Sequence, residues 1–130
     1  MKEAVLELAS LAHAVDVPAA ADKTDVDPDK LVEFLKAQAS QLHREASRCG
    51  SVLGLPTLDE SSAKFVTDAI TGPAALLVSG CQLLVRHAGP TRAAAIRNVV
   101  RCVLLLLSVC VLMLLLSLCH YHHHHHHHHH

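Results

Sequence analysis

The chain has 130 residues, a formal net charge of −1, 51% hydrophobic residues and only 2% aromatic residues. This length allows one domain, and the scarcity of aromatic side chains argues against a sheet protein. Four basic residues follow Asp68, all of them arginines, and they are too sparse for direct nucleic-acid binding. We therefore expect an all-α protein, because leucine and alanine favour helices.

The first part of the chain predicts two helices separated by a linker. Residues 1–15 form an N-terminal helix, and residues 16–26 are a linker rich in alanine and aspartate. The second helix begins in the segment DVDPDK, where Asp27 can cap the helix and Pro28 fits its first turn. Helical spacing predicts an apolar stripe on the first helix at Val5, Leu8, Leu11, Ala12 and Val15, and on the second at Leu31, Phe34, Leu35, Gln38, Leu42 and Cys49.

Two further helices complete the predicted fold. The segment TLDE has the form of a capping box, in which Thr57 reaches forward and Glu60 reaches back. In the third helix, Gly72-Pro73 predicts a kink or a short interruption. Thr91 can cap the fourth helix, which continues into the leucine-rich end of the chain. Together with the helix at residues 1–15, residues 27–101 and this end therefore predict an antiparallel four-helix bundle. The side chains expected to point inward from the third helix are Phe65, Val66, Ala69 and Ile70.

The sequence carries no catalytic or metal-binding motif that survives a check of its spacing. Asp25, Asp27 and Asp29 are spaced like the start of a calcium-binding loop, but lysines occupy the positions of the required glycine and glutamate. The isolated histidines and the five cysteines show neither a nucleophile pattern nor metal-ligand spacing. We expect no enzyme, no cofactor and no metal site. The isolated histidines, expected at the surface, are His13, His43 and His87.

The tail, residues 120–130, ends in nine consecutive histidines, His122 to His130. We interpret these histidines as an affinity tag, with a natural low-complexity tract as the alternative. A homopolymer fixes no coordination geometry, so the tail predicts no metal site.

Residues 102–119 form an 18-residue run without a charge, a proline or a glycine, and nine of the 18 are leucine. A helix of this length measures about 27 Å, close to the roughly 30 Å of a bilayer core. Its leucines contribute roughly −4 to −5 kcal/mol on an insertion scale. The run is therefore either a tail anchor, which would leave residues 1–101 in the cytosol, or bundle core. Burial as core requires an enclosed central helix or self-association, because no face of the run is polar.

Three segments resemble the N-terminal helical region of the cyclin-D-binding protein family, which are helix–loop–helix regulators lacking a basic region. They are LVEFLKAQASQLHREASRCGSVLGLPTLDESSAKFVTDAI, LLVSGCQLL and GPTRAAAIRNVVR. The shared features are the REAS-like segment from Arg44 to Ser47, the linker at Leu55 and Pro56, the KFVTDAI-type helix, and the basic start from Arg97 to Arg101. The chain departs from the family after Arg101, where the family pattern continues as an amphipathic helix followed by a second helical domain. We therefore expect a truncated or diverged member.

The resemblance implies a non-catalytic interaction module in cell-cycle and transcriptional control, located in cytoplasm and nucleus. Its implied partners are cyclin D or helix–loop–helix factors. Such a module would dock partner helices on apolar helix faces, although apolar residues at helical spacing also build a bundle's own core. The candidate docking residues, each with this core interpretation as its alternative, are Leu31, Phe34, Leu35, Leu42, Phe65, Val66 and Ile70.

Overall fold

The computed structural model describes residues 2–19, 26–55 and 58–128, with side chains described up to residue 120. In these ranges the chain forms helix α1 (Lys2–Ala14), helix α2 (Pro28–Leu53), helix α3 (Glu60–Leu84), the 3₁₀ turn η1 (Val85–His87) and helix α4 (Pro90–His128). The predicted all-α, antiparallel four-helix bundle is confirmed.

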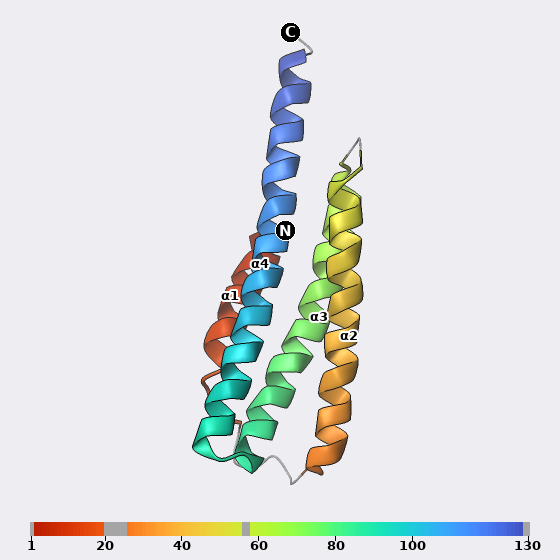
Figure 1. Ribbon diagram of the computed structural model, residues 1–130. Coiled ribbons are helices and arrows are strands. Elements are labelled where there is room, and N and C mark those ends of the chain that lie inside the picture. Colours follow the sequence, from red (N-terminus) through yellow and green to blue (C-terminus); the bar gives the residue numbers. More distant parts are fainter. Residues whose placement is uncertain (1, 20–25, 56–57, 129–130) are drawn as a thin grey trace.

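The four helices alternate in direction along the bundle (Figure 1). The most extensive contact joins α2 to α3, and α1 packs on α4 and on α3. Helix α3 also contacts α4, whereas α2 and α4 touch much less. Helix α4 is the longest element and extends beyond the ends of the other three at its C-terminal end (Figure 1). The bundle is therefore closed on three of its sides and open between α2 and α4.

The helix starts follow local chemistry, with two corrections to the predicted caps. Asp27 caps α2 as predicted: its side chain accepts a 3.0 Å hydrogen bond from the Asp29 backbone N–H. Helix α3 is capped by Asp59, whose carboxylate accepts from the Ser61 N–H at 3.1 Å, and Thr57 lies outside the described residues. The N-cap residue is therefore Asp59, the residue directly before the helix, which supplies the side-chain acceptor that a cap needs.

The predicted interruption of α3 and the predicted cap of α4 are also corrected. Helix α3 runs through Pro73 without interruption, because Ile70 and Ala74 on either side of the proline are fully buried and tertiary packing holds the helix. Helix α4 begins at Pro90, one residue before the predicted cap Thr91, and its first turn closes with a bond from the Ala93 N–H to the Gly89 carbonyl. Proline suits this position because its ring presets the helical backbone angle.

The core runs along the bundle axis and takes buried side chains from all four helices. Its largest fully buried side chains include Leu8 of α1, Ile70 of α3 and Leu104 of α4. On α4 the buried positions recur every three or four residues, the spacing of one helix face turned toward a bundle. This inner seam of α4 consists of Val100, Leu104, Leu107, Val111, Leu114 and Leu118. The leucine-rich run therefore supplies one wall of the core.

Polar contacts fix the C-terminal end of α1 against the rest of the bundle. The Gln82 side-chain amide donates to the Ala14 carbonyl at 2.7 Å, and the Arg86 guanidinium donates to the Ala19 carbonyl at 2.7 Å. Arg101 of α4 forms an ion pair with Asp16. These contacts tie the end of α1 and the segment that follows it to α3, to the 3₁₀ turn and to α4.

Candidate interaction surface

The structure divides the seven candidate docking residues into core and surface. Leu31, Leu42, Val66 and Ile70 are buried in the bundle, so for these four the core interpretation is confirmed. Of these four, Leu42 also lines the groove described next. The inward orientation predicted for the two phenylalanines is wrong. Phe34 is 38% exposed and Phe65 is 62% exposed, because each lies at the edge of its helix's buried stripe. The seventh residue, Leu35, is half-buried and lines the groove described next.

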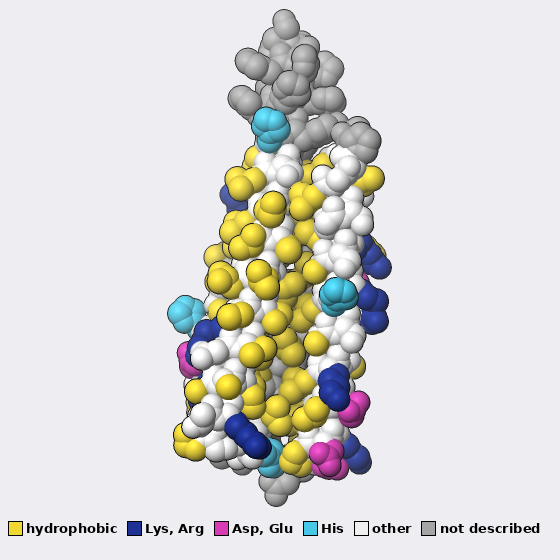
Figure 2. Space-filling model, in the orientation of Figure 1, with side chains coloured by type: hydrophobic (Ala, Val, Ile, Leu, Met, Phe, Trp, Pro, Cys, Tyr) yellow, Lys and Arg dark blue, Asp and Glu magenta, His cyan; other side chains and the backbone are white. Residues whose placement is uncertain are grey.

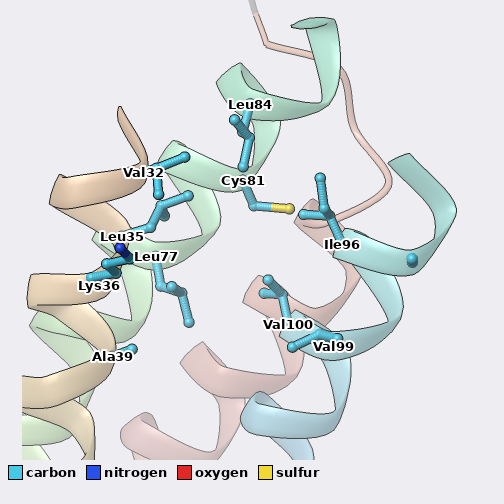
Figure 3. A pocket seen from close by; sticks show the side chains of 11 residues that line it. Val32, Leu35, Lys36, Ala39, Leu77, Cys81, Leu84, Ile96, Val99 and Val100 are labelled. Atoms are coloured by element: carbon cyan, nitrogen blue, oxygen red, sulfur yellow. The ribbon is translucent and has the colours of Figure 1, made fainter. Parts of the chain in front are cut away.

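An apolar groove lies between α2 and α4, with α3 as its floor (Figure 3). It consists of two adjoining cavities with volumes of about 410 and 330 Å³ that share several lining residues. All but two of its lining residues are apolar; the exceptions are Lys36 and His43, one in each cavity. We call this feature the α2–α4 groove. Its main walls are Val32, Leu35 and Ala39 on α2, Leu77 and Cys81 on α3, and Ile96, Val99 and Val100 on α4.

The groove is open because α2 leans onto α3 rather than onto α4. At Gly80 of α3, an added Cβ atom would lie only 2.5 Å from the Leu35 Cδ2 atom and 3.5 Å from a ring carbon of Phe34. The missing side chain therefore allows the two helices to approach closely at this point. The same approach leaves space on the other side of α2, facing α4.

The outward side of α4 is a second apolar surface, continuous with one wall of the groove (Figure 2). Its large side chains are between 44% and 68% exposed. Only 28% of the apolar window in this helix is buried, so α4 is not an enclosed central helix in the bundle. We call this surface the outer face of α4; it consists of Val99, Cys102, Leu105, Leu106, Val109, Leu112, Met113 and Leu116.

Charged side chains flank α4 near both ends of its outer face. The Asp16–Arg101 ion pair lies at the start of the run. Near its other end, Leu115 shares a cavity with charged residues from α1 and α3. These residues are Lys2, Glu3, Glu60 and Lys64. The packed bundle therefore places charge beside the apolar run near its start and near Leu115.

A buried carboxylate on α2 forms a polar cluster that sequence reasoning missed. Glu45 is 3% exposed; it accepts a 3.0 Å hydrogen bond from the Gln41 side-chain amide and pairs with Arg48 at 3.2 Å. The Arg48 guanidinium also lies 5.6 Å from the centre of the Phe65 ring, within cation–π range. A buried charge needs partners of this kind. Because Gln41 and Arg48 supply them, we interpret the cluster as structural.

The cysteines and histidines gather into no reactive or metal-binding arrangement within the described part of the chain. All five cysteines are free, and no three histidine, cysteine or acidic side chains are placed to hold a metal ion. Burial raises the pKa of the Cys49 thiol to about 11, so it stays protonated at neutral pH and is a poor nucleophile. The three isolated histidines are exposed, as expected.

Comparison with known proteins adds no identity, because no family model, curated protein or solved structure matches the chain. By length and composition alone, two segments of the described helices could cross a membrane, Glu60–His87 and Pro90–His120. Core helices of soluble proteins also pass this test, but such helices are mostly buried, and in α4 only the inner seam is.

Proposed function

We propose that the chain is a non-catalytic protein-interaction module that holds an apolar partner helix in the α2–α4 groove. The observation that carries this proposal is the groove itself, an apolar channel open to solvent between two helices of a bundle. Amphipathic helices bind in grooves of this kind with apolar anchors at helical spacing. Enzyme sites instead need convergent polar groups around a pocket, and the groove wall offers only Lys36 and His43.

The dimensions of the groove suit one helix. Along α4 its wall runs from residue 95 to residue 107, which corresponds to roughly 18 Å or about three helical turns. Three turns present anchors at positions i, i+3 or i+4, and i+7 of a bound helix. Because the wall is apolar, we infer that these anchors are aliphatic or aromatic side chains.

The resemblance to the cyclin-D-binding family suggests which partners to test first. We propose cyclin D or a helix–loop–helix factor as the source of the bound helix, acting in cytoplasm or nucleus. Helix–loop–helix factors are rich in amphipathic helices, which is the chemistry that the groove selects. A direct role in nucleic-acid binding is not proposed, because the basic residues are few and dispersed.

Replacing Ala39 with lysine should weaken partner binding at least tenfold, about 1.4 kcal/mol. Ala39 is exposed and lines both cavities, so a lysine there fills the groove with a charged side chain without entering the core. Ala37→Lys is the matched control: it is exposed on the same helix, two residues away, and does not line the groove. Titration of cyclin D and of a helix–loop–helix factor against all three proteins measures the effect.

Two outcomes would contradict this proposal. Equal weakening by both lysine substitutions would show that the groove is not the docking site. Failure of cyclin D and of the helix–loop–helix factor to bind the unmodified chain would remove these proteins as partners.

A tail-anchored membrane protein is a second candidate function, favoured by the exposed outer face of α4. In this case α4 would leave the bundle and cross the bilayer, with Arg92, Arg97 and Arg101 on its cytosolic side and residues 1–101 in the cytosol. Alkaline carbonate extraction of membranes from cells that express the chain separates the two candidates. The interaction module predicts release into the supernatant, and retention in the membrane pellet would support the anchor.

A further inference from the structure

We propose that the outer face of α4 is covered by α4 of a second copy of this chain, in an antiparallel, two-fold symmetric dimer. This inference goes beyond the proposed function and does not rest on it. The two surfaces share Val99 and Leu106, but the groove is tested at Ala39 and the dimer at Val109, which does not line the groove.

The outer face has the spacing of a coiled-coil seam. Exposed residues at positions 99, 102, 106, 109, 113 and 116 alternate in steps of three and four, which is the heptad pattern that keeps one side of a helix against a partner helix. The inner seam, at positions 100, 104, 107, 111, 114 and 118, also alternates in steps of three and four. Each of its positions follows an outer-seam position by one or two residues. Helix α4 therefore carries two apolar seams, and the bundle of one copy covers only the inner one.

The charges around α4 favour a protein cover over lipid. If the bundle stayed packed while α4 crossed a bilayer, the Asp16–Arg101 pair and the charges around Leu115 would enter the hydrocarbon core. A charged side chain at the bilayer centre is costly. Helix–helix contact across the outer face leaves these charged groups at the edge of the interface, where water can reach them.

The composition of the outer face suits a second copy. A two-fold interface places the same patch on both partners, so a charged residue in it would lie near the same charge on the second copy and be repelled. From Cys102 to Cys119 the run carries no charge at all. The face exposes seven large apolar side chains, and a contiguous apolar patch of this kind marks a contact surface.

The distribution of arginines sets the direction of the second helix. Arg92, Arg97 and Arg101 all lie near the start of α4, and from Pro90 to its end this helix has no acidic residue. A parallel pair would bring the two arginine clusters together, whereas an antiparallel pair places them at opposite ends. Antiparallel pairing of the seam positions then places Cys102 of each copy against Met113 of the second copy, and Leu106 against Val109.

The first experiment measures oligomeric state. Sedimentation velocity of the full chain without detergent should give twice the 14.0 kDa monomer mass. Val109→Glu should give a monomer with unchanged helix content, because it places two carboxylates near the two-fold axis and weakens dimerisation at least a hundredfold. Leu76→Glu is the control: Leu76 is exposed to the same extent on α3, outside the seam, and the dimer should persist.

The second experiment tests the direction of the pair. Two thiols opposite each other in a coiled coil fall within disulfide range. Under mild oxidation M113C should form a covalent dimer through Cys102 of the other copy, and adding Cys102→Ser should abolish it. A rapid Cys102–Cys102 cross-link in the unmodified chain would overturn the antiparallel arrangement. A monomeric unmodified chain, or one that stays in solution only with detergent, would overturn the dimer, and the latter result would favour lipid as the cover.

Discussion

Deletion of residues 102–119 should unfold the bundle rather than release a soluble helical head. The deletion removes five buried side chains of the inner seam: Leu104, Leu107, Val111, Leu114 and Leu118. Each contributes about 1.5–3 kcal/mol by burial, so their sum is comparable to the whole 5–15 kcal/mol by which a domain is stable. We expect the circular-dichroism signal for helix to fall sharply and the cooperative thermal transition to disappear.

A variant that changes only the outer face is the control for this deletion. Leu105→Gln, Val109→Gln, Leu112→Gln and Leu116→Gln combined remove exposed apolar surface and leave the inner seam intact. This variant should keep its helix content and its cooperative transition. If the deleted chain instead remains helical, monomeric and cooperative, the run is not core, and the tail-anchor candidate gains support.

Leu104→Ala should lower the free energy of unfolding by about 3 kcal/mol, within the range measured for buried leucines in other proteins. Leu104 is 0% exposed and packs in the core, so alanine leaves a cavity. Leu105→Ala, one residue along the same helix, should change the free energy by no more than about 0.5 kcal/mol, because Leu105 is 66% exposed. Urea denaturation of each variant in the Val109→Glu background measures the difference without a contribution from dimerisation.

A similar loss of stability for the two alanine variants would contradict the arrangement of α4. It would mean that the inner and outer seams are equally covered in the folded monomer. A small loss for both would mean that α4 is not packed against the other helices at all.

The sequence predicts the helices well because their starts and stripes are local properties. The Asp27 cap follows from side-chain chemistry within one turn of helix. The stripe of α1 is also found as predicted, with Leu8 and Val15 fully buried and the rest half-buried. One overturned feature depends on tertiary packing: α3 continues through Pro73 without interruption because the buried residues around it hold the helix. The two corrected caps are local, since Asp59 caps α3 and α4 begins at Pro90.

The missed side chains lie at the borders of buried stripes. Phe65 and Val66 are consecutive, so they point about 100° apart on a helix, and only Val66 can face the core fully. Glu45 is the opposite case: a carboxylate at a core position. Its spacing of three from Leu42 and four from Cys49 places it on the buried stripe, and this signal could have identified it.

The sequence alone predicts the helices, but it does not predict the groove or the outer face as well. Because α4 is apolar on every side, its sequence does not distinguish the seam that faces the bundle from the one that faces away. That choice depends on where α1 and α3 pack. The groove depends on the close approach at Gly80, which is a property of two helices together.

The pairing of α1 with α4 joins the two extremes of the chain, and this sets an order on biosynthesis. The α2–α3 hairpin is local in sequence and can form early, whereas the Asp16–Arg101 pair spans 85 residues. On the ribosome, which adds residues from the N-terminus, α1 is made first and acquires its main neighbour last. Until α4 is synthesised, the apolar stripe of α1 lacks its main partner helix. We therefore expect chaperones that act on nascent chains to bind at α1.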